Sequence, residues 1–179
     1  MKDLVEILEA MSLRKGDMQN PQELFLDMAE RVVKHVCAAF SAKPDEVAIL
    51  ILTTDHKHLR FVAPRKFLEL GTIPITKRDS IAVNVFGRKT GEALNNVPMV
   101  KHVSFFESVK LRDKVLPIQK MITVPIISHK QVVGVAQVSR KGESPAQSGP
   151  DFTPMDVKKA QDMFEVVGPL LFGARPERF

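Results

Sequence analysis

The stretch ITVPIISHKQVVGVAQVSRKG, residues 122–142, constrains the fold of this chain more than any other feature. Two apolar runs rich in Val and Ile flank a short polar segment at 128–130, which is the pattern of two β-strands joined by a tight turn. Alternation along the second strand would place four small or branched side chains on one face: Val132, Gly134, Ala136 and Val138. The small side chains of Gly134 and Ala136 predict that a covering helix approaches the sheet closely there.

Helical signals lie on both sides of this hairpin. Residues 20–23 supply an N-cap residue, a proline at the first helical position and an acidic residue at the third. Apolar residues then recur every three or four positions and predict a long amphipathic helix over 21–42. The cap, proline and acid pattern recurs at 153–156 and begins a last helix, which the Gly-Pro pair at 168–169 should kink or end.

Between these helices the apolar period changes to that of strands. The nearly continuous apolar run at 46–53 predicts a central strand buried on both faces. A turn joins it to an alternating strand at 58–63, which completes a hairpin. A short strand at 71–76 contains Pro74, which favours the edge of a sheet. Residues 92–96 form a further weak strand.

The remaining segments link these elements. Asp79 or Ser80 would cap a short helix over 81–89. Mixed apolar and basic residues at 97–116 predict a loop with a helical turn, and the Gly, Ser and Pro of 142–150 predict a flexible surface loop. Hairpins between terminal helices predict an α+β fold with a central antiparallel sheet of five to six strands.

Composition limits the function classes. The net charge of +5 is spread in pairs and neither Tyr nor Trp is present, so we expect no nucleic-acid role. The longest apolar runs are too short to cross a bilayer, and we expect no membrane association. The first predicted helix, 3–11, carries acidic residues and does not resemble a signal peptide. The lone Cys37 excludes an internal disulfide framework, and we expect a cytoplasmic protein.

The order of these elements and three segments together resemble the GAF domain family. Residues 70–94 resemble its central segment, a short Pro-containing strand followed by a helix and a Thr-Gly-Glu step. Residues 121–142 resemble its Val-Pro-Ile and Gly-Val hairpin, and residues 151–164 its final helix with a Phe-Thr-x-x-Asp start. The similarity spans about 20–172. We therefore divide the chain into an N-terminal helical extension, 1–17, and one GAF-like domain, 18–175.

The resemblance implies that the N- and C-terminal helices cover one face of the sheet and that a ligand pocket lies under a helix and loop lid on the other. Members of the family bind cyclic nucleotides, tetrapyrroles, amino-acid-like metabolites or no known ligand, and many dimerise through their terminal helices. The chain lacks the Asn-Lys-Phe-Asp-Glu set of the cyclic-nucleotide subset. Cys37 falls on the apolar face of the first long helix, where a structural thiol is expected rather than a chromophore anchor or a reductase nucleophile.

The lid, 97–116, and the strands below it supply the candidate ligand-binding residues implied by this arrangement. They are Ile51, Thr53, Asn95, His102, Ser104, Phe105, Phe106 and Thr123. In the alternative interpretation, Phe105 and Phe106 fill the pocket as core. No motif for a catalytic residue or a metal site is found, and the ligand or cofactor is unknown.

The main hypothesis is a non-catalytic sensory or regulatory domain that binds a small molecule in signal transduction. The alternatives are a ligand-free dimerisation or docking module and, third, a redox enzyme resembling methionine sulfoxide reductase. An apolar stripe in the N-terminal helix, with Leu4 and Leu8 at its centre, would pack on a partner subunit or on the last helix. This favours a homodimer formed through the terminal helices. Any signal would pass to an unidentified partner protein.

Overall fold

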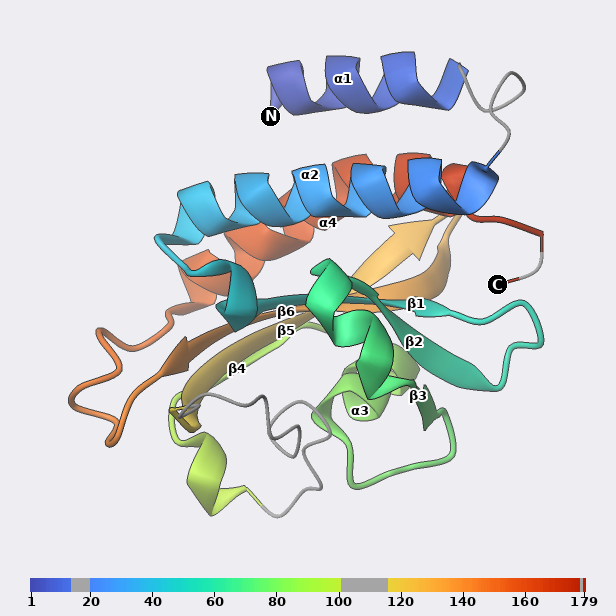
Figure 1. Ribbon diagram of the computed structural model, residues 1–179. Coiled ribbons are helices and arrows are strands. Elements are labelled where there is room, and N and C mark those ends of the chain that lie inside the picture. The colour runs from blue at the N-terminus through green and yellow to red at the C-terminus, as the bar shows by residue number, and fades with distance from the viewer. Residues whose placement is uncertain (14–19, 101–115, 178) are drawn as a thin grey trace.

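The computed structural model describes residues 1–13, 20–100, 116–177 and 179. Its centre is a six-stranded sheet with the strand order β3-β2-β1-β6-β5-β4 (Figure 1). The strands are β1 (Val47–Leu52), β2 (His58–Ala63), β3 (Thr72–Pro74), β4 (Glu92–Leu94), β5 (Ile118–Ser128) and β6 (Gln131–Lys141). Every pair is antiparallel. The predicted α+β class and sheet are confirmed, and β3 with Pro74 lies at an edge as expected.

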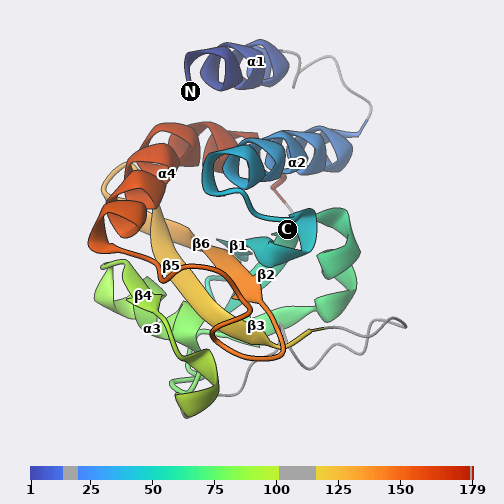
Figure 2. The same ribbon diagram turned by 90° about the vertical axis from the view of Figure 1, so that its left-hand side faces the viewer.

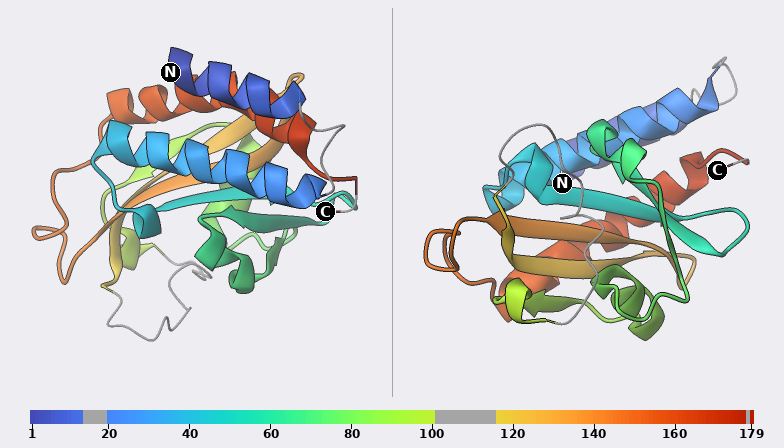
Figure 3. Two further views of the ribbon diagram at one scale, coloured as in Figure 1. Left: turned by 45° about the horizontal axis from the view of Figure 1, so that its top comes forward. Right: turned by 60° about the horizontal axis from the view of Figure 1, so that its bottom comes forward.

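Helices cover both faces of this sheet. The α-helices are α1 (Lys2–Leu13), α2 (Pro21–Phe40), α3 (Ile81–Arg88) and α4 (Pro154–Ala174). Short 3-10 helices are η2 (Pro44–Glu46), η3 (Arg65–Leu70) and η4 (Val97–Met99). Helices α2 and α4 lie on one face, here called the helix face, while α3 lies on the opposite face, here called the underside (Figures 1 and 3).

Helix α1 lies across the outer side of α2 and α4 (Figure 2). Leu4 and Leu8 are buried in the core that these two helices share with the sheet. The sequence predicts that this helix packs either on a partner subunit or on the last helix. In the structure it packs on the last helix of its own chain, α4, and also on α2. Among the described parts of the chain, no helix is both long and apolar enough to span a bilayer.

Helix α4 begins where the sequence predicts but does not end at its Gly-Pro pair. The Thr153 hydroxyl accepts the Asp156 N–H at 3.2 Å, and the Asp156 carboxylate accepts the Thr153 N–H at 2.8 Å, which forms a capping box. The helix then continues through Pro169 to Ala174, so of the two expected effects of this pair, a kink or an end, the end is excluded. The residues around Pro169 pack on the sheet, which compensates for the donor that proline lacks.

Close approach between helix and sheet depends on Gly168 of α4 rather than on the hairpin glycine. A Cβ atom at Gly168 would lie 2.5 Å from the Ile127 carbonyl oxygen of β5. A Cβ atom at Gly134 would instead lie 2.3 Å from the Leu50 carbonyl oxygen of the neighbouring strand β1. The reason given above for Gly134 is thus corrected: its missing side chain admits a strand, not a helix.

The two faces of the sheet carry separate apolar clusters. On the helix face, alternate residues of β1 and β5 such as Ile49 and Ile122 pack with α2 and α4. On the underside, Leu50 of β1, Phe61 of β2 and Val135 of β6 pack with α3 and η3. The central strand β1 is therefore buried on both faces, as predicted.

Candidate functional site

A row of paired residues crosses four strands on the underside of the sheet. Ala48 of β1 pairs with Gln137 of β6, Gln137 pairs with Thr123 of β5, and Thr123 pairs with Glu92 of β4. Directly paired residues of antiparallel strands project from the same face. Ala48 belongs to the apolar cluster of the underside, so this row faces α3 rather than α2 and α4.

Two neutral polar side chains are buried at the middle of this row. Gln137 is 6% exposed and Thr123 is 1% exposed. The Gln137 amide nitrogen donates to the Thr123 hydroxyl at 3.2 Å and lies 3.1 Å from the sulfur of Met121. Met121 in turn packs with apolar residues of α3 and η4, among them Ile81 and Val97. A polar pair thus lies inside an otherwise apolar layer.

The outer end of the row carries opposite charges that pair with each other. The Arg88 guanidinium donates to the Glu92 carboxylate at 2.6 Å and joins the end of α3 to the edge strand β4. The Arg88 side chain is 59% exposed, so this ion pair adds little stability. The buried part of the row, from Ala48 to Thr123, contains no charged side chain.

The structure separates the candidate residues predicted on the strands. Thr123 lies on the underside, as expected. Ile51 was expected in the pocket floor but is buried on the helix face, because alternation gives β1 two apolar faces and Ile51 projects from the wrong one. Thr53 lies in the turn after β1, where its hydroxyl donates to the Asp55 carboxylate at 2.6 Å and accepts the His58 N–H at 3.1 Å. Its contacts stabilise the hairpin.

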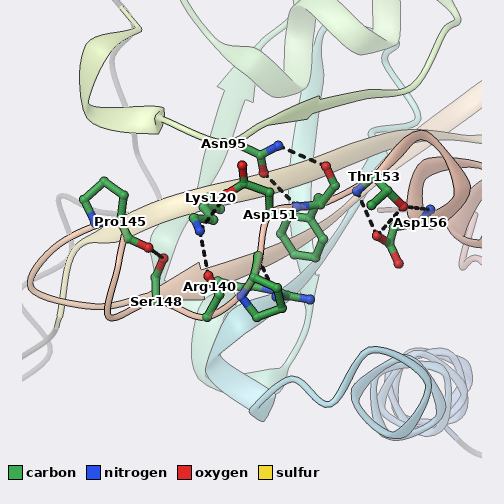
Figure 4. Close-up of polar contacts among 11 residues, drawn as sticks. Asn95, Lys120, Arg140, Pro145, Ser148, Asp151, Thr153 and Asp156 are labelled. Carbon is green, nitrogen blue, oxygen red and sulfur yellow. Dashed lines mark hydrogen bonds and ion pairs between the residues drawn. The ribbon is translucent and has the colours of Figure 1, made fainter.

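Asn95, another candidate, is engaged in a structural clasp. Its Nδ2 donates to the Phe152 carbonyl at 2.9 Å, and its Oδ1 accepts the Phe152 N–H at 2.8 Å (Figure 4). Both polar atoms of the Asn95 amide therefore have protein partners, which argues against a ligand contact. The other four candidates lie outside the described residues and stay predictions: His102, Ser104, Phe105 and Phe106.

The same clasp belongs to a set of contacts that hold the connection between β6 and α4. Lys120, 5% exposed, donates to the Gly149 carbonyl at 2.6 Å and pairs with Asp151 at 2.7 Å (Figure 4). The Arg140 guanidinium lies 4.4 Å from the centre of the Phe152 ring. The loop predicted to be flexible at 142–150 is thus anchored by a buried cation and by backbone acceptors.

Gln137 is a buried polar residue that the sequence prediction missed. A signal was available, because Gln137 interrupts an apolar strand, and alternation places it on the opposite face from Ala136 and Val138. That it lies beside Thr123 follows only from the register of β5 and β6.

Cys37 lies on α2, half-buried against the core of the helix face, as predicted. Burial, followed by the negative charges of Glu46 and Asp45, raises the pKa of its thiol. A raised pKa disfavours the thiolate that a nucleophilic cysteine needs. The thiol also lies on the opposite side of the sheet from Thr123 and Gln137.

Comparisons by sequence and by structure give different results. No protein-family model matches the chain, and no curated protein is detectably similar to it in sequence. Among solved structures, the GAF domain of a phosphoenolpyruvate-protein phosphotransferase from Coxiella burnetii is similar, with a TM-score of 0.66, 14% identity and coverage of 96% of this chain and 94% of that one. The corresponding Acinetobacter GAF domain has a TM-score of 0.64, 13% identity and coverage of 94% and 92%.

A type II free methionine-R-sulfoxide reductase from Thermoplasma acidophilum is also similar, with a TM-score of 0.60, 14% identity and coverage of 85% of this chain and 95% of that one. At such identities the likeness extends to the fold and not to an activity. The sheet order, the helices on both faces and these neighbours together show that the chain has the GAF-domain fold.

Proposed function

We propose that this chain is a non-catalytic regulatory domain that binds a small molecule on the underside of its sheet, around Thr123 and Gln137. The observation that supports this best is the buried polar pair within an apolar layer. Small-molecule sites combine mostly apolar walls with a few placed polar groups. A fold that needed only a packed core at this position would favour apolar residues there.

Catalysis by a thiol is disfavoured for this chain. The reductase among the structural neighbours shares the fold, but the one cysteine here lies on the helix face and has a raised pKa. A regulatory role requires instead that the ligand bind one conformation more tightly than another. Strand β5, which carries Thr123, also packs on α4, so a change at the ligand could alter the surface that α4 offers a partner protein.

The direct experiment is a thermal-shift screen of the purified chain against a metabolite panel. A ligand at one hundred times its dissociation constant should stabilise the protein by about 2.7 kcal/mol. Thr123→Val should reduce that stabilisation, whereas Thr72→Val, the same change at an exposed position of β3, should not. If no compound raises the midpoint, or if Thr123→Val responds like wild type to every hit, the proposed site is wrong.

A ligand-free dimerisation module is the second candidate, and one observation favours it. Helix α1 buries Leu4 and Leu8 but leaves Ile7 41% exposed and Leu13 85% exposed. These side chains offer apolar surface to a second copy of the helix layer. Sedimentation across a wide concentration range tests this: a monomer–dimer equilibrium that Ile7→Glu abolishes would support the candidate, and a monomer at all concentrations would exclude it.

A further inference from the structure

We propose that the terminal amide of Gln137 is the group that selects the ligand, and that it selects small uncharged molecules with an apolar body and an N–H group as hydrogen-bond donor. This inference rests on the proposed function above, because it names the chemistry recognised at the same site.

The hydrogen bonds of this amide are incomplete. A glutamine side chain offers two donors on nitrogen and one acceptor oxygen. The nitrogen of Gln137 faces Thr123 and Met121, at 3.2 and 3.1 Å. Within the described parts of the chain, no group donates to its oxygen. Exchanging the positions of the nitrogen and the oxygen would leave the nitrogen in that place instead, so in either assignment one polar atom of Gln137 has no partner among the described residues.

The described neighbours of Gln137 along and across the strands do not supply the missing partner. The residue paired with it across β1 is Ala48, and the next residue on the same face of β6 is Val135. On the other side along β6, the Ser139 hydroxyl donates to the Glu46 carbonyl at 3.0 Å. Since Gln137 is only 6% exposed, bulk water does not compensate readily.

A second buried glutamine has a structural role in this fold. Gln119 of β5 is 4% exposed, and its nitrogen donates to the Gly142 carbonyl at 2.8 Å, which holds the start of the loop after β6. Buried polar groups in folded proteins generally have such partners. The Gln137 amide has contacts only with the Thr123 and Met121 side chains among the described residues and with no main-chain group there, so a molecule that pairs its remaining polar atom explains its burial better than a role in the fold does.

The surroundings define the kind of molecule. Ala48, Met121 and Val135 present apolar surface, and Thr123 is the other buried polar side chain of the row. The charged pair at its end, Arg88 and Glu92, is already mutually neutralised. A charged ligand would lose its hydration without a counter-charge from the described residues of this row, which is strongly unfavourable. A neutral ligand with one hydrogen-bond donor loses little hydration free energy on entering this site, because the donor finds a new acceptor.

The first test compares the two glutamines in the ligand-free protein. Replacing both members of a buried polar pair by apolar groups of similar size is nearly neutral or stabilising, whereas removing one partner of a hydrogen bond is destabilising. We therefore expect the double variant Thr123→Val/Gln137→Met, which removes the unpaired atom together with the hydrogen bond between the two side chains, to unfold at the same or a higher urea concentration than wild type. Gln119→Met, which leaves the Gly142 carbonyl without its donor, should unfold at a lower one. Equal destabilisation by both would mean that Gln137 is already paired, by an internal water for example, and would overturn the inference.

The second test uses matched fragments and the methyl resonance of Met121 in protein labelled with ¹³C at its methionine methyl groups. The probes are 2-pyrrolidone and benzamide, which carry N–H donors, and their N-methylated counterparts N-methyl-2-pyrrolidone and N,N-dimethylbenzamide. We expect the N–H compounds to shift this resonance with about fivefold higher affinity, corresponding to one hydrogen bond. In Gln137→Met the two members of each pair should bind equally.

The outcomes separate this inference from the proposed function. If both members of each pair bind wild type equally, the site exists but Gln137 does not select the donor, and the inference alone fails. If Gln137→Met still binds the N–H fragments more tightly than their N-methylated counterparts, another group accepts the hydrogen bond from the ligand, and the inference fails again. If no fragment shifts the Met121 resonance and no metabolite stabilises the protein, the proposed function fails with it.

Discussion

The substitution Asn95→Ala distinguishes a structural clasp from a ligand contact. Asn95 follows β4, and Phe152 precedes the N-cap residue of α4, so the two hydrogen bonds between them join an edge strand to the start of a helix (Figure 4). The alanine variant loses both bonds and leaves the N–H and carbonyl groups of Phe152, a residue only 4% exposed, without these partners.

The expected loss is large for a single polar substitution. Each hydrogen bond contributes about 1 kcal/mol net, and each buried backbone group left unpaired costs about 1–3 kcal/mol if no water reaches it. We expect Asn95→Ala to lower the free energy of unfolding by about 2–4 kcal/mol, a substantial part of the stability of about 5–15 kcal/mol that is typical of a domain. Asn95→Asp keeps the acceptor but places a carboxylate oxygen against the Phe152 carbonyl, and should be no more stable.

Urea denaturation monitored by circular dichroism measures this effect, and Asn96→Ala is the matched control. Asn96 is the adjacent residue, is exposed, and its side chain makes no capping hydrogen bond to η4, so its loss should change stability by less than about 0.5 kcal/mol. An Asn95→Ala variant as stable as wild type, but with an altered ligand response, would refute the clasp and restore Asn95 as a ligand residue.

Three further predictions follow from the packing and the charges. Gly168→Ala should destabilise the protein by about 1–3 kcal/mol by overpacking, because its Cβ would lie 2.5 Å from a backbone oxygen. In the control Gly87→Ala, no atom lies within 4 Å of the Cβ position, so this change should stabilise α3 by about 0.5–1 kcal/mol. Equal effects of the two substitutions in urea melts would contradict this prediction. Leu8→Ala should release α1, which amide hydrogen exchange detects as lost protection there while α2 stays protected, and Ile7→Ala should not. Hydrogen bonds from the Thr153 backbone and hydroxyl hold the pKa of Asp156 below its usual value, so the stability that Asp156 contributes is present above about pH 4 and is lost as the pH falls through the lowered pKa. Asp156→Asn should therefore weaken the loss of stability at acid pH, and an unchanged acid dependence would count against the capping box.

Several elements were predictable because their determinants are local. The cap residues Asn20 and Thr153 begin α2 and α4 because a side-chain oxygen pairs an N–H only three residues along the chain. The hairpin of β5 and β6 follows from two apolar runs and a polar turn that are contiguous in sequence. The edge position of β3 follows from the donor that Pro74 lacks. The class of the fold depends on these signals alone.

The candidate site was only partly predictable, because face and partner are properties of the assembled sheet. Strand β1 is apolar on both sides, so alternation cannot tell which of Ile51 and Leu50 lies on the underside; the helices that cover each face decide it. Asn95 looks like an available amide in sequence, yet its partner lies 57 residues away.

The sequence by itself therefore determined the elements, their order and the antiparallel α+β class, since these depend on contacts within a few residues. The tertiary structure alone decided that Gly168 rather than Gly134 admits a helix, that α1 packs on its own chain, and that Gln137 lies buried beside Thr123. Those relations depend on strand register and on contacts between distant segments, which a local pattern does not encode.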